Sequence, residues 1–143
     1  MCGIAGLHLK NPELEPQLGS LIVPIVEHLT SRGPDSAGVA LYDDDVTQGQ
    51  LRFSLRAASA TYDWEGLART LGGRVDAPTT ARSMGDVGLI TTGAHESLFL
   101  TALDEVDPDI VTVGVGEAMT IYKDVGLPRD ICDRYGIPSA HGY

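Results

Sequence analysis

The sequence contains few cysteines, little basic charge, a single asparagine and no long hydrophobic run. Its two cysteines, Cys2 and Cys132, cannot build a framework of disulfide bonds. The most apolar run, residues 21–26, is far too short to span a bilayer. The N-terminus lacks the basic region and uninterrupted apolar stretch of a secretory signal. These absences predict a cytoplasmic protein, because a reducing compartment keeps a reactive thiol reduced.

Basic residues are outnumbered two to one, with 10 Lys and Arg against 20 Asp and Glu, which gives a net charge of −10. Such a surface repels phosphate backbones and anionic lipids, so neither nucleic acid nor a membrane is expected as a partner. No metal or cofactor is expected either. The acidic run at 43–45 lacks the spacing of a calcium loop, and residues 114–116 carry only part of a dinucleotide fingerprint.

At 143 residues, with 43% hydrophobic and 21% charged residues, the chain is expected to be one globular domain with a buried core. Hydrophobic spacing predicts helices near 14–29, 63–71, 98–106 and 128–135, with a kink or break of the first helix at Pro24. Buried strands are predicted at 4–9 and 37–42, and a strand with water-facing arginines at 51–56. A further strand is predicted at 87–92 and a hairpin at 110–122, while residues 74–86 show no clear element.

Cys2 directly follows the initiator methionine, and this position has a chemical consequence. Aminopeptidases that remove Met1 accept small second residues, so Cys2 could become the first residue with a free α-amine. The thiol then has an unperturbed pKa of about 8.5 and the amine one of about 7.7–8.0. At neutral pH, part of the amine is neutral and can take the thiol proton, as in other nucleophiles activated by an N-terminal amine. The alternative is that Cys2 is a small apolar residue at the start of a strand.

A second motif changes the balance between these two interpretations. Residues 31–38 read Ser-Arg-Gly-Pro-Asp-Ser-Ala-Gly, and residues 1–6 read Met-Cys-Gly-Ile-Ala-Gly. Together, in this order and position, the two motifs closely resemble the class II glutamine amidotransferases, a group with an N-terminal nucleophile. Residues 119–126, Met-Thr-Ile-Tyr-Lys-Asp-Val-Gly, are also similar to amidotransferase-like subunits of glutamate-synthase-type and N-methylglutamate-synthase-type systems.

This resemblance implies both a fold and a reaction. The expected fold is α+β, an Ntn-hydrolase-like four-layer αββα sandwich, of which residues 1–143 would form the N-terminal part. The expected reaction is attack of Cys2 on the side-chain amide of glutamine, which gives glutamate and ammonia for a partner synthase. Arg32 would lie near the nucleophile, Gly33 and Pro34 would form a tight turn, and Gly3 would leave room for the substrate. Asp35 would pair with Arg32 or accept local amides, although a purely structural turn is the alternative for both.

The sequence also departs from the family. The family's later segments supply an arginine for the substrate carboxylate, an aspartate for its amine and an Asn-Gly pair for the oxyanion hole. None has a convincing match here, and the only asparagine is Asn11. We therefore expect the chain to be roughly half of a domain, either truncated or completed by another polypeptide. Because half a domain exposes sheet edges and apolar faces, the isolated chain is expected to self-associate.

Two other functions remain open at this point. The chain could be an inactive interaction module that keeps the scaffold without the substrate clamps. It could also be an N-terminal-nucleophile hydrolase that acts on another amide. The retention of Cys2 and Arg32 argues against decay of the nucleophile, while the missing clamps argue against turnover by this chain alone.

Overall fold

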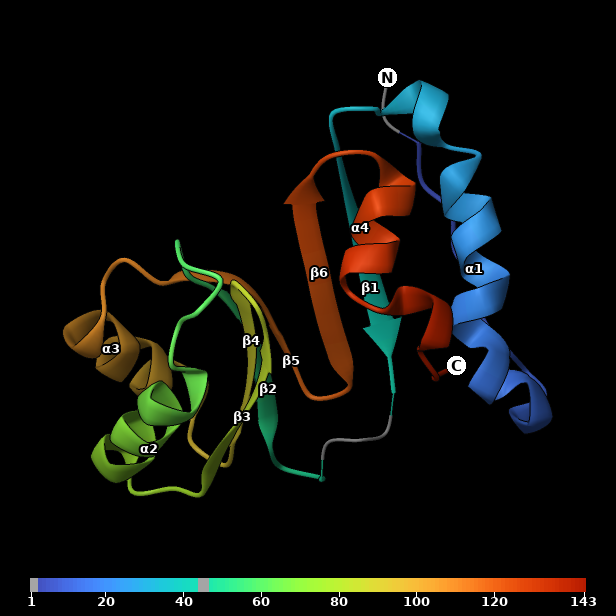
Figure 1. The fold of residues 1–143 in the computed structure, drawn as a ribbon. Coiled ribbons are helices and arrows are strands. Elements are labelled where there is room, and N and C mark those ends of the chain that lie inside the picture. Colours follow the sequence, from blue (N-terminus) through green and yellow to red (C-terminus); the bar gives the residue numbers. More distant parts are fainter. Residues whose placement is uncertain (1–2, 44–46) are drawn as a thin grey trace. The chain divides into compact units, whose positions relative to one another are not determined.

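The computed structural model describes residues 3–43 and 47–143. The predictions for Cys2 and for two of the three acidic residues at 43–45 therefore lie outside the described residues. The chain divides into two compact units (Figure 1), and each is considered by itself. Residues 1–43 and 121–143 form what we call the terminal unit, and residues 44–120 form the middle unit. In the described residues, no helix has the length and apolar character needed to cross a membrane.

The middle unit is a four-stranded antiparallel sheet with two helices on one of its faces (Figure 1). Its strand order is β3-β4-β2-β5. In chain order, its elements are β2 (Leu51–Arg56), α2 (Trp64–Val75), β3 (Thr79–Met84), β4 (Val87–Thr92), α3 (Glu96–Val106) and β5 (Val111–Gly116). Phe53 of β2 stands opposite Ile90 of β4 and Val115 of β5, which fixes the register of the central strand.

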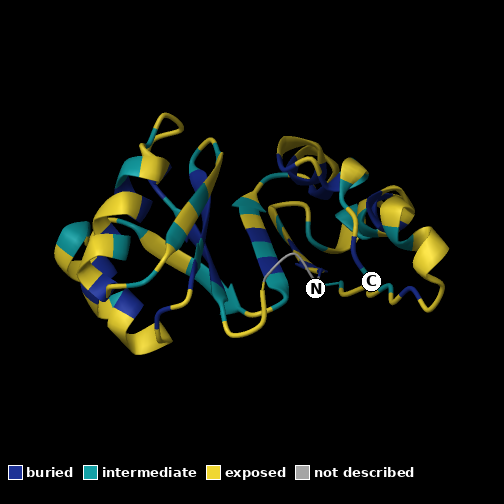
Figure 2. Ribbon diagram, turned by 90° about the horizontal axis from the view of Figure 1, so that it is seen from below, coloured by how far each residue is buried: buried dark blue, intermediate teal, exposed yellow. Residues whose placement is uncertain are grey.

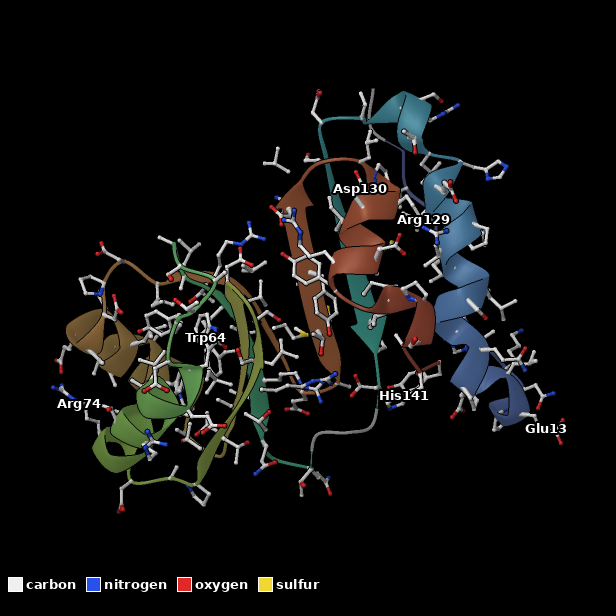
Figure 3. All side chains as sticks on the ribbon, viewed as in Figure 1. Glu13, Trp64, Arg74, Arg129, Asp130 and His141 are labelled. Carbon is white, nitrogen blue, oxygen red and sulfur yellow. The ribbon has the colours of Figure 1, made fainter. Side chains whose placement is uncertain are left out.

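The core of the middle unit is aromatic and fills the space between the helices and the sheet. The rings of Phe53 and Phe99 stack with their centroids 4.1 Å apart. Trp64, labelled in Figure 3, is buried, and its Nε1 donates a hydrogen bond of 2.9 Å to the carbonyl of Gly85. A Cβ atom on Gly88 would lie 2.2 Å from the Trp64 ring, so β4 needs glycine at this position. Figure 2 shows buried residues where the helices and strands face each other, and exposed residues on the outer sides of the helices.

The terminal unit is built around a two-stranded sheet of β1 and β6. Its elements are a 3-10 helix at Pro12–Gln17, α1 (Leu18–Glu27), a 3-10 turn at Thr30–Arg32, β1 (Ser36–Tyr42), β6 (Met119–Val125), α4 (Pro128–Arg134) and a 3-10 turn at Ile137–Ser139. The amide of Gly126, just after β6, donates a hydrogen bond of 2.9 Å to the carbonyl of Asp35, just before β1. The start of β1 and the end of β6 are therefore held together.

The C-terminal residues and α4 pack against α1. The amide of Gly19 donates to the carbonyl of Ala140 at 3.0 Å, and a Cβ atom on Gly19 would lie 1.9 Å from the carbonyl oxygen of Ile137. Arg129 of α4 approaches Glu27 of α1 with an N–O distance of 3.6 Å, and Figure 3 shows its side chain on the α1 side of α4. Because the turn at residues 137–139 lies so close to the backbone of α1 at Gly19, only glycine fits at position 19.

The buried strand predicted at 4–9 is wrong. Residues 3–10, all of them described, have no regular secondary structure, and the Ile4 side chain is 95% exposed. Leu9 is buried, so only the end of the apolar run contributes to a core. A strand needs a hydrogen-bonded neighbour as well as apolar side chains, and the glycines at 3 and 6 weaken the extended conformation. The hydrophobic pattern of a sequence reports the apolar side chains but not the hydrogen-bonded neighbour.

The hairpin predicted at 110–122 is also wrong. Both strands exist, but β5 pairs with β2 in the middle unit, whereas β6 pairs with β1 in the terminal unit. The turn between them therefore connects two sheets. Local turn residues indicated that the chain reverses, and they carried no information on which strand each segment pairs with. That choice depends on long-range contacts.

The arginines predicted to face water on β2 are not both exposed. Arg52 is only 7% exposed, and its Nη1 donates a hydrogen bond of 2.6 Å to the hydroxyl of Thr120. The alternation of the strand was read correctly, since Phe53 and Leu55 face the core. What the pattern missed is that Arg52 and Ser54, on the other face of this central strand, are buried as well, so polar groups there need partners.

The four predicted helices are present, but most of their first and last residues differ from the predicted ones. α1 continues through Pro24 to Glu27 without the predicted break, because Pro24 is exposed and the carbonyl that loses its partner can be hydrated. Asp63 caps α2 and accepts a hydrogen bond of 2.8 Å from the amide of Gly66. α2 then runs past its two glycines and ends at Asp76, whose φ is +50°. The strand β3, in the region without a prediction, follows directly.

Candidate functional site

The two sequence motifs meet in the terminal unit. A Cβ atom on Gly3 would lie 3.1 Å from Cδ2 of Leu29 and 3.3 Å from Cδ of Arg32. The backbone of residue 3 therefore rests against the Arg32 stem, and a larger residue at position 3 would have to push one of these side chains aside. Cys2 lies outside the described residues, but it is bonded to Gly3. The segment that follows Cys2 and the motif at 31–38 share one site.

Local hydrogen bonds hold the turn that carries Arg32. The hydroxyl of Thr30 donates to the carbonyl of Glu27 at 2.6 Å, which continues α1 into the 3-10 turn. The amide of Arg32 donates to the carbonyl of Leu29 at 2.8 Å, and the amide of Gly33 to that of Thr30 at 3.3 Å. Pro34, which has no amide hydrogen, then leads the chain out of the turn toward β1. The short turn fixes Arg32 at the end of α1.

A cavity of about 440 Å³ opens at this turn. Its wall comes from three parts of the terminal unit: the N-terminal segment, the stretch from the end of α1 to the start of β1, and the start of α4. The lining residues are Gly3, Ile4, Ala5, Val26, Leu29, Arg32, Gly33, Pro34, Asp35, Ser36, Ala37, Gly38 and Pro128. All the predicted site residues other than Cys2 therefore line one cavity, whose volume lies in the range of about 300–1,000 Å³ typical of small-molecule sites.

The cavity has one cationic and one acidic side chain among its described lining residues, Arg32 and Asp35. Both side chains are exposed. The structure shows no ion pair between them, and neither side chain hydrogen-bonds to another described residue. Asp35 is anchored instead through its backbone carbonyl, which accepts from Gly126. The expected Arg32–Asp35 pair is thus absent from the described part of the chain.

A second cavity, of about 230 Å³, lies along the same strand and is mostly apolar. It is bounded by residues 5–7, by α1, by β1 from Gly38 to Tyr42 and by Tyr143. Ala5, Val26 and Gly38 line both cavities, so the N-terminal segment borders the two spaces in succession. The described residues 3–10 form no strand with β1, and both segments contribute to the walls of the two cavities.

Eight of the lining residues of the first cavity were not predicted as site residues, and Ser36 and Pro128 show two reasons for this. Ser36 lies inside the motif at 31–38, and its position directly after Asp35 was the available signal. Pro128 comes from α4, almost a hundred residues further along the chain. It was identified only as the first residue of a helix. No local pattern could have connected it with Arg32, because their proximity is created by the pairing of β1 with β6.

Asn11 and Cys132 can be placed away from this cavity. The side chain of Asn11 accepts a hydrogen bond of 3.1 Å from the amide of Glu13 and caps the first 3-10 helix. It therefore has a local structural role. Cys132 is buried on α4, and burial raises the pKa of its thiol, with a further contribution from Asp133. Within residues 3–43 and 47–143, no group of three His, Cys, Asp or Glu side chains could hold a metal ion.

The chain is similar to two curated proteins over almost its whole length. It is 38% identical to the glutamine amidotransferase-like protein GlxB of Rhizobium meliloti, over 99% of this chain and 47% of that protein. It is 26% identical to a protein of Methanothermobacter thermautotrophicus whose name provisionally assigns it as a glutamine amidotransferase, over 99% of this chain and 49% of the other. The chain spans about half the length of these relatives. No family model and no solved structure matches it.

Proposed function

We propose that this chain is the nucleophile-bearing part of a class II glutamine amidotransferase. The observation that supports this most strongly is the contact of Gly3 with Arg32, because it joins two motifs about thirty residues apart at one cavity. The names of the two relatives support glutamine as the substrate. The expected four-layer sandwich is part of the same proposal. In support, the described residues form a mixed α/β structure with two antiparallel sheets and four α-helices.

In the proposed reaction, Met1 is removed and Cys2 becomes the first residue. Its α-amine takes the thiol proton, and the sulfur adds to the side-chain carbonyl of glutamine. The same proton is delivered to the leaving nitrogen, so ammonia departs and a glutamyl thioester remains on Cys2. Water then adds to the thioester, releases glutamate and returns a proton to the sulfur. Ammonia would pass to a partner synthase.

The oxyanion of this reaction needs hydrogen-bond donors, and the loss of one such donor typically costs about 2.7–4 kcal/mol of transition-state stabilisation. Asn11, the only asparagine among these 143 residues, caps a 3-10 helix and does not line the cavity. We therefore propose that the donors come from polypeptide outside the 143 residues. The same observation favours the alternative function, an amidotransferase-like module that is inactive until a second polypeptide joins it.

The test is ammonia and glutamate release from L-glutamine by the protein with its processed N-terminus verified by intact mass. Cys2→Ala should abolish release, while the matched Cys132→Ala, on the buried face of α4, should retain it. If release appears only after addition of a second polypeptide, the interaction-module alternative gains support. Retention of Met1 in the mature protein, or turnover by Cys2→Ala, would exclude the proposed nucleophile.

A further inference from the structure

We propose that the mouth of the first cavity is the docking surface for the polypeptide that completes the candidate site. Three apolar residues, Ile4, Val125 and Leu127, form the contact surface, which we call the apolar rim. The occupant is the counterpart of the part of the two relatives that this chain does not match. The proposal rests on the proposed function, which requires donors from a second polypeptide, and it adds the surface on which that polypeptide lies.

The residues of the apolar rim are strongly exposed to solvent. Ile4 is 95% exposed, Val125 78% and Leu127 45%. Single exposed apolar residues are common on protein surfaces, whereas apolar residues that gather around a concave site mark an interaction surface. The position of these three residues therefore decides what their exposure means.

All three residues belong to the wall of the first cavity or adjoin it. Ile4 is itself a lining residue, and Leu127 directly precedes α4, whose first residue also lines the cavity. The amide of Gly126, between the other two members of the rim, donates its hydrogen bond to the carbonyl of the lining residue Asp35. Figure 1 shows the start of β1, the end of β6 and the start of α4 at the same end of the terminal unit. Two segments far apart in the sequence thus place apolar residues around one cavity.

Local structure does not explain why Leu127 is apolar. Leu127 is the N-cap of α4, and its side chain makes no capping hydrogen bond. A Ser, Thr, Asp or Asn side chain at an N-cap accepts a hydrogen bond from a free amide of the first turn, as Asp63 does at the start of α2. Leucine gives up this bond and stays partly exposed, so the advantage of an apolar side chain at this position must come from a contact outside the described residues.

The lengths and charges of the chains identify the occupant. This chain spans 47% and 49% of the two relatives, so about half of each relative has no counterpart in these 143 residues. A rim of three residues is small beside the area of about 800 Å² that each partner of a stable complex typically buries. It is sufficient for a covalently linked segment, which avoids the entropy cost of bimolecular association. A second copy would bring together two chains of net charge −10, which repel each other.

The experiment compares the accessibility of the apolar rim in two proteins. One is the 143-residue chain, and the other is a chimera in which this chain replaces the matched part of the Rhizobium meliloti relative. Each protein carries Cys2→Ser and one cysteine in the rim, which is labelled with N-ethylmaleimide and quantified by peptide mass. The rim variants are Ile4→Cys, Val125→Cys and Leu127→Cys.

Each rim cysteine should react about tenfold or more slowly in the chimera than in the 143-residue chain, because a covered thiol reacts only while its cover is open. Leu98→Cys on α3 and Leu21→Cys on α1 are the matched controls. These leucines are 50% and 40% exposed, and neither lines the first cavity. The control cysteines should therefore react at the same rate in both proteins.

Unchanged rates at the three rim positions, or equal slowing at the two control positions, would overturn the proposed surface. Slowing in the 143-residue chain alone, as its concentration rises, would assign the rim to a second copy and would also overturn it. If the chimera shows no cooperative unfolding in urea, the unmatched part of the relative is refolded together with the 143-residue chain. Absence of protection in that mixture would then reject the surface.

The proposed function is read separately, from glutamate release by the chimera that retains Cys2. Release that depends on Cys2, without protection of the rim, would reject the docking surface and leave the proposed function intact. Protection of the rim without any release would uphold the docking surface and reject the proposed reaction.

Discussion

The two units of this chain differ in how completely their apolar side chains are buried. In the middle unit, a four-stranded sheet and two helices enclose Phe53, Trp64, Leu71 and Phe99, and all four are almost completely buried. In the terminal unit, the sheet has only two strands, and Val125 is 78% exposed. A two-stranded sheet is marginally stable on its own, whereas three or more strands packed on helices support independent folding. The candidate site lies in the unit with the weaker framework.

This contrast is measurable because each unit contains its own reporter. Trp64 is the only tryptophan in the chain and lies in the middle unit. Cys132 lies in the terminal unit, where its buried thiol reacts with a reagent only when the unit opens. In a Cys2→Ser background, we expect Cys132 to become reactive at a lower urea concentration than the Trp64 fluorescence transition. Coincident transitions would mean that the two units unfold as one.

The largest expected effect tests the core of the middle unit with one substitution at two positions of α3. Leu103 is 4% exposed and Leu98 is 50% exposed. Leu103→Ala should lower the free energy of unfolding by about 2–5 kcal/mol, because it removes buried methyl groups and leaves a cavity. Leu98→Ala should change it by no more than about 0.5 kcal/mol. Urea titration followed by Trp64 fluorescence measures both, and equal effects would contradict the assigned core.

The next effect tests the packing of the C-terminal turn on α1. In Gly19→Ala the new Cβ would lie 1.9 Å from the carbonyl oxygen of Ile137, so the backbone must shift. We expect a loss of about 1–3 kcal/mol, confined to the terminal unit. Reaction of Cys132 with a thiol reagent in the Cys2→Ser background should then accelerate, by about tenfold for each 1.4 kcal/mol.

A matched glycine substitution in the other unit should have the opposite sign. Gly73 lies inside α2, and a Cβ atom there meets nothing within 4 Å. Gly73→Ala should therefore raise the stability of the middle unit by about 0.5–1 kcal/mol, through the lower entropy of the unfolded chain. A loss of stability in Gly73→Ala would contradict the open space around Gly73, and a gain in Gly19→Ala would contradict the close approach described for Gly19.

An effect of similar size tests a polar contact between the residues just before α2 and just after α3. The hydroxyl of Tyr62 donates a hydrogen bond of 2.6 Å to Asp107, and burial, aided by this carboxylate, raises the pKa of Tyr62 to about 12. Tyr62→Phe should cost about 1 kcal/mol at neutral pH. The unfolded chain loses this proton near pH 10, before the folded protein does, so the stabilisation should be fully present below pH 10.

As the pH rises from 10 to about 12, the wild type should lose this contribution and the difference between wild type and Tyr62→Phe should shrink. Urea unfolding followed by circular dichroism at pH 8, 10 and 11.5 measures the difference. A difference that stayed constant over this range would show that Tyr62 and Asp107 are not coupled in the folded state.

Local sequence was sufficient for elements whose signals are themselves local. The helix predicted near 63–71 was found because a helix satisfies its hydrogen bonds within a few residues, here from the Asp63 cap onward. Pairing was not predictable in this way. β5 and β6 were identified as strands, yet their partners lie in different sheets. The partner of a strand is decided by contacts between residues far apart in the chain, and a hydrophobic pattern carries no information on those contacts.

The candidate site also combines residues that local sequence predicts with a residue that only long-range strand pairing brings to it. Gly3 and Arg32 were selected from two motifs, and their contact follows from the turn at the end of α1. Pro128 joins the cavity only because β6 pairs with β1 and carries α4 to it. The motif left open whether Asp35 pairs with Arg32 or accepts local amides. Within the described residues the structure shows no ion pair between these two side chains.

The most direct test of the central claim is chemical trapping of the proposed thioester. Hydroxylamine attacks a thioester carbonyl, frees the thiol and yields a hydroxamate. Incubation of the processed protein, together with any polypeptide needed for turnover, with L-glutamine and hydroxylamine should give γ-glutamyl hydroxamate. The account predicts that Cys132→Ala forms this product and Cys2→Ala does not. Two results would contradict the account. One is equal hydroxamate formation by Cys2→Ala, and the other is the absence of hydroxamate when Met1 has been removed from the protein.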